Sequence, residues 1–179
     1  MHENAPSSPA EGQPKDPESL YRQEGAGLFR YLLGVLGNRE EAEDAMQTIW
    51  IEMIGRWGSI ESPVAYLWRT ARHQALRQRR RGFLAMARDV LIGSQEENPL
   101  DMLPAETNPG LSHEDRLAMA QAVSKLPFEQ REAVVLMAFE GRSAREAGER
   151  LGVTESTIDS RYRTALGTLR KKLARRKSQ

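Results

Sequence analysis

The stretch SAREAGERLGVTESTIDSRYRTALGTLRKK, from Ser143 to Lys172, predicts two helices joined by a tight turn. Ser143 and Glu146 have the spacing of a capping box, which satisfies free backbone N–H groups at the start of the first helix. Gly152 tolerates positive φ and is placed to end that helix, and Thr154 is placed to cap the next one. The stretch therefore predicts a helical hairpin whose second helix becomes strongly basic toward its end.

The spacing of three residues in this hairpin is typical of a helix-turn-helix motif. Gly148 lets the helices cross closely, Gly152 makes the turn four positions later, and Ile158 packs the second helix onto the first. In such a motif the second helix lies in the major groove of DNA, with its N-terminal residues at base edges. The alternative is an ordinary helical hairpin with a solvated basic face. The agreement of spacing, caps and basic tail favours the DNA-binding motif.

Composition favours an all-α fold and excludes several kinds of protein. Of the 179 residues, 39% are hydrophobic and 6% aromatic, which allows one domain or two small ones with helical cores. The absence of cysteine excludes disulfides, thiol nucleophiles and thiolate metal sites. The longest apolar run, Val134–Phe139, is far too short to span a membrane, and the N-terminus lacks the pattern of a secretion signal. We therefore expect a cytoplasmic, all-α protein.

Positive charge is concentrated in two stretches, although the net charge of the chain is only +1. Residues 69–81 and 161–177 are rich in arginine and lysine and contain no acid, whereas acids are concentrated in residues 40–44 and 96–114. Solvated helix ends are one interpretation of a single basic stretch. Two such stretches on an otherwise balanced chain predict a phosphate-binding surface instead.

Composition along the chain divides it into two small helical domains. Proline, serine, glutamate and glycine dominate the first residues, and a second stretch rich in proline and acids lies in the middle. A cap followed by proline at Asp16-Pro17 predicts the first helix, in which Gly25 and Gly27 allow a break. We expect a disordered leader at 1–16, a first domain at 17–84, a linker at 85–112 and a second domain at 113–177.

Two amphipathic helices dominate the predicted first domain. The helix from Asn38 to Trp57 has a predicted buried stripe and an acidic opposite face, which is either simply solvated or a docking surface for a basic partner. The stripe consists of Ala42, Ala45, Met46, Ile49, Met53 and Ile54. The helix that starts at Ser62-Pro63 has a basic face with an aromatic and an imidazole, which suits phosphates and unpaired bases. An ordinary basic surface helix is the alternative for this face.

No catalytic pattern is visible in the sequence. His2, His73 and His113 are scattered without metal-ligand spacing, and no glycine loop follows a strand as a phosphate-binding loop would. Carboxylates lie on helix faces at regular steps from apolar neighbours. We therefore expect a protein that is not an enzyme and that needs no cofactor or metal.

Three stretches, in this order, resemble regions of the bacterial σ70 family, specifically its small two-domain extracytoplasmic-function (ECF) sigma factors. They are EAEDAMQTIW (Glu41–Trp50), PVAYLWRTARHQALRQRRR (Pro63–Arg81) and LPFEQREAVVLMAFEGRSAREAGERLGVTESTIDSRYRTALGTLRKKL (Leu126–Leu173). The first resembles region 2.2, the second regions 2.3 and 2.4, and the third region 4. The resemblance covers nearly all of the chain after about residue 17 and is most specific in region 4.

The resemblance implies partners and residue roles. It implies a promoter-specificity subunit that binds the β′ clamp helices and β flap of core RNA polymerase, binds promoter DNA both double-stranded and melted, and is usually held inactive by an anti-sigma protein. For polymerase binding the implied residues are Glu43, Asp44, Gln47 and Trp50. For the −10 element and melting they are Ser59, Tyr66, Arg69, Arg72, His73, Arg77 and Arg80. For the −35 element they are Thr154, Glu155, Ser156, Thr157, Asp159, Ser160, Arg161 and Arg163.

Four positions depart from the family pattern. Tyr66 stands where the family favours tryptophan, His73 where asparagine is frequent, Arg77 where aspartate is frequent, and Asp159 where a basic residue is common. An aspartate in the recognition helix repels phosphate but can accept a hydrogen bond from cytosine N4. These departures leave the fold unchanged and bear on which −10 and −35 sequences are read.

Three other interpretations stay open on the sequence. One is a conventional helix-turn-helix regulator with an N-terminal sensor, against which the arginine-rich helix in the first domain argues. Another is a degenerate sigma-like adaptor that binds polymerase or a regulator without reading promoters. A nucleic-acid enzyme is disfavoured because no catalytic constellation is visible.

Overall fold

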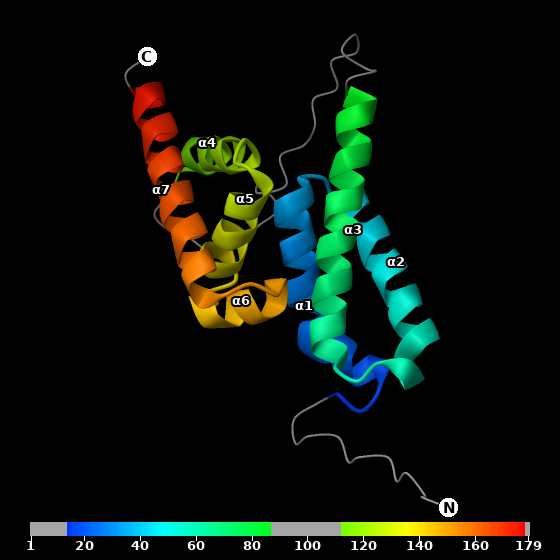
Figure 1. Ribbon diagram of the computed structural model, residues 1–179. Coiled ribbons are helices and arrows are strands. Elements are labelled where there is room, and N and C mark those ends of the chain that lie inside the picture. Colours follow the sequence, from blue (N-terminus) through cyan, green and yellow to red (C-terminus); the bar gives the residue numbers. More distant parts are fainter. Residues whose placement is uncertain (1–13, 87–111, 178–179) are drawn as a thin grey trace, which may run out of the picture.

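The computed structural model describes residues 14–86 and 112–177. The secondary structure of these residues is helical, as expected, and they form two groups of helices side by side (Figure 1). The elements are α1 (Pro17–Leu36), α2 (Arg39–Arg56), η1 (Trp57–Ser59), α3 (Pro63–Met86), α4 (His113–Ser124), α5 (Phe128–Val134), η4 (Val135–Phe139), α6 (Ala144–Leu151) and α7 (Glu155–Lys177). Most of the expected leader and most of the expected linker lie outside the described residues.

Helix α1 is continuous through both of its internal glycines, so the break that Gly25 and Gly27 allow does not occur. Asp16 caps the helix by accepting a hydrogen bond from the backbone N–H of Ser19 at 2.7 Å, and Pro17 follows at the first helical position. Gly37, at φ 87°, ends it in the left-handed region that glycine favours. Glycine at positions 25 and 27 weakens an isolated helix, but packing of α1 against α2 and α3 stabilises it.

Helices α2 and α3 complete a three-helix first domain with α1. The predicted stripe of α2 faces the core, with Ala42, Ala45, Ile49 and Met53 buried. Ile54 is a correction, because its side chain is 62% exposed. It lies one position after Met53, and a helix turns by about 100° per residue, so the two cannot share a narrow buried face. On α3, Leu67, Trp68, Ala71 and Ala75 point inward as predicted.

The second domain begins with α4 and α5 and continues through a π-helical segment. The sequence predicts one regular helix from Phe128 to Glu140, but η4 (Val135–Phe139) replaces its second half. The backbone N–H of Glu140 bonds the carbonyl of Val135 at 3.0 Å, five residues back, which widens the turn. Residues 134–139 are all apolar, so the sequence shows no periodicity here that separates a π-helical segment from an α-helix.

The helix-turn-helix prediction is confirmed in its details. Ser143 and Glu146 form the capping box of α6, and Gly152 ends it at φ 68°. Helix α7 follows. Its Ile158 is fully buried in an apolar cluster that contains residues of both domains. A Cβ added to Gly148 would lie 2.7 Å from the carbonyl oxygen of Val153, so this glycine allows the turn itself to fold back onto α6.

Candidate nucleic-acid interface

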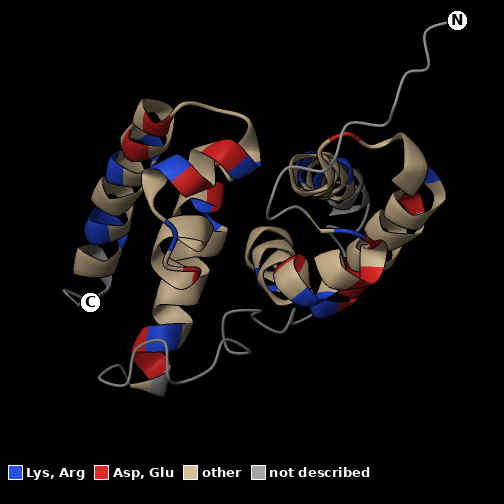
Figure 2. Ribbon diagram, turned by 90° about the horizontal axis from the view of Figure 1, so that it is seen from below, with Lys and Arg blue, Asp and Glu red and all other residues tan. Residues whose placement is uncertain are grey.

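The N-terminal turns of α7 present the residues predicted to read the −35 element. The hydroxyl of Thr154 accepts a hydrogen bond from the backbone N–H of Thr157 at 3.3 Å, which caps the helix. Exposed side chains here are Thr154, Glu155, Ser156, Ser160 and Arg163, and partly buried ones are Thr157, Asp159 and Arg161. Lys and Arg recur along α7 toward its C-terminus (Figure 2), so the polar residues predicted to read bases precede a basic stretch.

Arg161 differs from its neighbours on this helix. Its Nη1 is buried and has no hydrogen-bond partner among the described residues. Its positive charge also acts on the buried carboxylate of Glu132. One of the side chains predicted to bind the −35 element therefore lies partly inside the molecule.

Helix α3 brings together most of the residues predicted to bind the −10 element. Tyr66 is half-buried, whereas Arg69, His73 and Arg77 are exposed at steps of three and four, which places them on one face. The Arg69 guanidinium carbon lies 5.4 Å from the centroid of the Tyr66 ring, in cation–π contact. This face combines cationic groups with an aromatic ring, as phosphate binding and base stacking require.

Glu52 of α2 orients Tyr66 and was not identified from the sequence. The Tyr66 hydroxyl donates to Glu52 Oε1 at 2.7 Å. Glu52 also lies 3.9 Å from the guanidinium of Arg56, whose carbonyl accepts a hydrogen bond from the Ser59 hydroxyl. Ser59, in η1, is thereby tied to the same corner of the domain. A carboxylate at a 14-residue separation from its tyrosine leaves no periodic signal in the sequence.

Arg72 and Arg80 are the two members of the α3 set that are not placed on this face. Arg72 points toward the second domain, where its Nε donates to Glu132 Oε1 at 2.9 Å. Its pKa is raised, because the hydrogen bond and negative charge of Glu132 outweigh the desolvation that opposes ionisation. The side chain of Arg80 lies outside the described residues. The aromatic and exposed basic residues predicted for the −10 element thus share one face, whereas Arg72 contacts Glu132.

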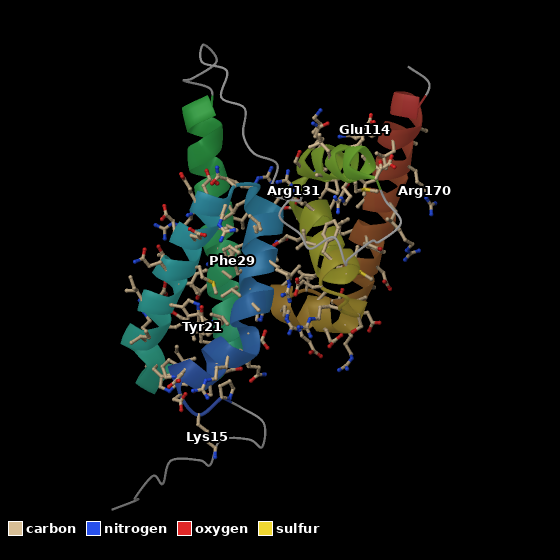
Figure 3. All side chains as sticks on the ribbon, turned by 180° about the vertical axis from the view of Figure 1, so that it is seen from behind. Lys15, Tyr21, Phe29, Glu114, Arg131 and Arg170 are labelled. Atoms are coloured by element: carbon tan, nitrogen blue, oxygen red, sulfur yellow. The ribbon has the colours of Figure 1, made fainter. Side chains whose placement is uncertain are left out.

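The acidic face of α2 carries the residues predicted to bind polymerase, beside an apolar groove. Glu43, Asp44 and Gln47 are exposed. The groove lies between α1 and α2 and is lined by Tyr21, Arg22, Gly25, Ala26, Phe29, Glu43, Met46, Gln47 and Trp50. The ring of Tyr21 meets that of Trp50 edge-on, with 5.0 Å between centroids. Figure 3 shows Tyr21 and Phe29 on the α1 side of this groove.

Among the described residues, the least exposed charged side chains lie between the two domains, and the sequence did not identify them. Glu132 is fully buried, Arg131 is 5% exposed and Glu24 is 6% exposed. Burial raises the pKa of Glu132, while hydrogen bonds from Arg72 and Tyr31 oppose that rise. In the sequence, Arg131 and Glu132 follow the polar Glu129 and Gln130 and precede an apolar run, and nothing there marks them as buried.

Neither a cluster of metal ligands nor a membrane-spanning helix occurs among the described residues. Across 14–86 and 112–177, no group of three or more His, Cys, Asp or Glu side chains could hold a metal ion. In these two ranges the helices are also too short or too polar to cross a membrane.

Comparisons with known proteins agree with this architecture. The family described as Sigma-70 region 2 matches residues 20–82, and the one described as Sigma-70, region 4 matches residues 116–169. ECF RNA polymerase sigma factor SigL of Mycobacterium tuberculosis (strain ATCC 25618 / H37Rv) is 31% identical over 160 residues, covering 85% of each chain. RNA polymerase sigma-E factor of Streptomyces antibioticus is 27% identical, covering 93% of this chain and 89% of that one.

Solved structures show the same fold. The sigma factor RpoE of Bartonella quintana, in complex with the anti-sigma factor NepR, has a TM-score of 0.64 and 22% identity. That match covers 90% of this chain and 98% of the other. CnrH, in complex with the cytosolic domain of CnrY, has a TM-score of 0.58 and 20% identity, with 92% of each chain covered. With region 2 and region 4 in order and a 31% identical relative matched over most of its length, the chain belongs to the σ70 family, among the ECF RNA polymerase sigma factors.

Proposed function

We propose that this chain is the promoter-specificity subunit that directs core RNA polymerase to promoters with −35 and −10 elements. The observation that carries the proposal is the pairing of two different DNA-reading surfaces in one chain: the polar start of α7 and the basic aromatic face of α3. A single operator-binding regulator needs only the first of these. The acidic face of α2 and the adjoining groove supply a separate surface for polymerase.

Each surface has a distinct part in initiation. The start of α7 reads base edges of the double-stranded −35 element, while the basic residues along its later turns neutralise phosphates. The α3 face holds the unstacked −10 strand, with the Tyr66 ring as a stacking platform and Arg69 and His73 beside it. Opening the duplex costs about a few kcal/mol. Binding the unstacked base on this face offsets that cost.

The same surfaces indicate which partners the chain binds. Asp44 and Gln47 on α2 bind the β′ clamp helices, and the second domain binds the β flap and the −35 element. Two solved sigma factors with this fold are in complex with an anti-sigma factor or the cytosolic domain of another protein. We propose a comparable inhibitory partner for this chain. Its work is binding rather than catalysis, and it is carried out in the cytoplasm, where RNA polymerase acts.

The test is co-purification of bacterial core RNA polymerase with this chain, followed by transcription from a genomic promoter library. Co-purification with new start sites that share upstream −35 and −10 motifs supports the proposal. Co-purification without transcription contradicts it and points to a sigma-like adaptor. Binding to DNA without binding to polymerase points instead to an ordinary helix-turn-helix regulator.

A further inference from the structure

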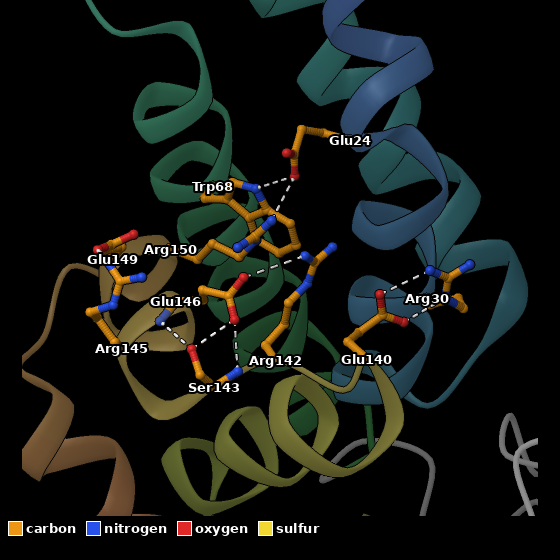
Figure 4. A network of polar contacts seen from close by, with 10 residues as sticks. All are labelled: Glu24, Arg30, Trp68, Glu140, Arg142, Ser143, Arg145, Glu146, Glu149 and Arg150. Carbon is orange, nitrogen blue, oxygen red and sulfur yellow. Dashed lines mark hydrogen bonds and ion pairs between the residues drawn. The ribbon is translucent and has the colours of Figure 1, made fainter. Parts of the chain in front are cut away.

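Two aromatic residues lie near the start of α3, and each is held by a glutamate from a different helix. Trp68 is 1% exposed, and its indole N–H donates to Glu24 Oε2 of α1 at 2.9 Å (Figure 4). Tyr66 is half-buried, and its hydroxyl donates to Glu52 Oε1 of α2 at 2.7 Å. Of these two rings, only that of Tyr66 has surface that a nucleic acid can reach.

The hydroxyl of Tyr66 is committed to Glu52. A phenol has a single O–H to donate, and a carboxylate can only accept. Hydrogen bonds from a hydroxyl to a carboxylate are short and among the stronger ones in proteins. While this bond is made, Tyr66 cannot donate to a base edge, so the face of its ring is what it offers to DNA.

The ring of Tyr66 is open to a planar group from the solvent side. The guanidinium of the exposed Arg69 lies over it, with 5.4 Å between the guanidinium carbon and the ring centroid. Unpaired bases stack on aromatic rings as guanidinium groups do. The position over the ring therefore suits a base that has left the duplex.

Glu52 also connects the two elements that carry these residues. Its carboxylate lies 3.9 Å from the guanidinium of Arg56, at the end of α2. The carbonyl of Arg56 accepts a hydrogen bond from the hydroxyl of Ser59, in η1, at 2.8 Å. Ser59 and Tyr66 are both predicted to bind the −10 element, and Glu52 is the residue through which they are linked.

The charge of Glu52 makes its role testable. The side chain is 39% exposed, and its negative charge repels the phosphates that the exposed arginines of α3 attract. If charge were all that mattered, removing Glu52 would help DNA binding. If Glu52 positions Tyr66, removing it would harm DNA binding. The two roles therefore predict opposite effects of the same substitution.

We propose that Glu52 is a positioning residue for promoter opening, because it fixes the Tyr66 ring in the orientation that receives an unstacked base of the −10 element. The inference rests on the proposed function. A ring that is already ordered loses less conformational freedom when the base binds. Tyr66 stands where the family favours tryptophan, a larger side chain without a hydroxyl. Glu52 thus supports a side chain that departs from the family pattern.

The test is promoter opening in a single turnover by saturating holoenzyme, which is core polymerase with this chain bound. Permanganate reactivity of unpaired thymines in the −10 region follows the reaction on a promoter found in the genomic library. Glu52→Ala should slow opening about tenfold, since it removes a hydrogen bond to a charged group, and should leave affinity for core polymerase unchanged. Glu52→Gln keeps an oxygen that accepts from Tyr66, so it should lose no more than about threefold.

A double variant shows whether Glu52 acts through Tyr66. Tyr66→Phe keeps the ring and removes the hydroxyl, so it should slow opening about as much as Glu52→Ala. Because both changes break the same hydrogen bond, the double variant should open no more slowly than either single variant. The matched control is Glu149→Ala, which should open promoters at the wild-type rate. Glu149 is also an exposed glutamate paired with an arginine on its own helix, Arg145, at 3.2 Å (Figure 4).

The outcomes separate this inference from the proposed function. Opening by Glu52→Ala at the wild-type rate or faster would overturn the positioning role, as would additive effects of the two single variants. Weaker core binding by Glu52→Ala, with normal opening once bound, would also overturn it and make Glu52 a polymerase contact. A wild-type chain that opens no promoter would remove the proposed function, and this inference with it.

Discussion

Arg131 illustrates how a single residue holds a buried charge without a carboxylate. Its guanidinium donates to the carbonyl of Val35 at 2.9 Å and to the carbonyls of Leu126 and Ser124. These carbonyls lie at the C-terminal ends of α1 and α4, where the helix dipole places partial negative charge (Figure 3). Burial lowers the pKa of Arg131 to about 10, so the group stays charged near neutral pH.

Gly148 is a residue at which a single methyl group should disturb the DNA-binding motif. The added Cβ of Gly148→Ala would lie 2.7 Å from the Val153 carbonyl oxygen, which belongs to the backbone and cannot rotate away. We expect unfolding by urea to show a loss of about 1 to 3 kcal/mol. Gly167→Ala is the matched control, because nothing lies within 4 Å of its added Cβ. It should be neutral or stabilising by up to about 1 kcal/mol. Equal effects of the two substitutions would contradict this account of the turn.

Glu146 gives the capping box of α6 a defined pH dependence. Hydrogen bonds from the Ser143 hydroxyl at 2.7 Å and its backbone N–H at 2.9 Å lower the pKa of Glu146. A lowered pKa contributes stability above the unfolded-state pKa, and that stability is lost as pH falls through the folded-state pKa.

The urea stability of wild type and Glu146→Gln should therefore differ at pH 7, and the difference should close below the unfolded-state pKa of Glu146, about 4.3. Glu149→Gln, on the same helix but outside the box, should show no such closing difference. A gap between wild type and Glu146→Gln that is constant with pH would show that the ionised carboxylate does not stabilise the cap.

Among the elements, α7 is the helix along which we propose that base reading and phosphate binding are separated. Arg161 lies in its second turn, and the exposed Lys171 lies near its end. In polymerase-dependent binding to promoter libraries, Arg161→Ala should relax the −35 preference by roughly 1 to 3 kcal/mol at the contacted position. Lys171→Ala should weaken binding alike for all sequences and reduce the salt slope by about one. If both variants changed only the overall affinity, α7 would not be the reading helix.

Helix α2 is the element whose surface should bind polymerase. Asp44 and Gln47 are exposed and lie beside the groove formed with α1. Replacing both with alanine should weaken binding to core polymerase by about tenfold or more, since few residues carry most of the energy of an interface. The measurement is a titration of labelled chain with core enzyme. Thr48→Ala, exposed on the same helix, is the control, and unchanged affinity of the double variant would refute the assignment.

At the scale of the whole molecule, features set by neighbouring residues could be predicted from the sequence. Contacts between the two domains could not. Caps at Asp16 and Ser143, the turn at Gly152 and the inward stripes of α2 and α3 depend on residues a few positions apart, which the sequence displays directly. The contacts of Glu132 join residues 60 and 101 positions apart in the chain. No periodicity encodes such a pair, so the sequence did not reveal the contact between Arg72 and Glu132.

Because one apolar cluster spans both domains, we expect the chain to unfold in a single calorimetric transition. Glu132→Ala leaves Arg72 partly buried without its carboxylate, and such a loss typically costs about 3 to 5 kcal/mol. At about 2 to 4 °C per kcal/mol for a chain of this size, the midpoint should fall by roughly 6 to 20 °C, and the domains should begin to unfold separately. Glu149→Ala, at an exposed site, should shift stability by no more than about 0.5 kcal/mol. Two transitions in the wild-type chain would show that the domains do not stabilise each other, whereas one transition that Glu132→Ala splits would show that this carboxylate couples them.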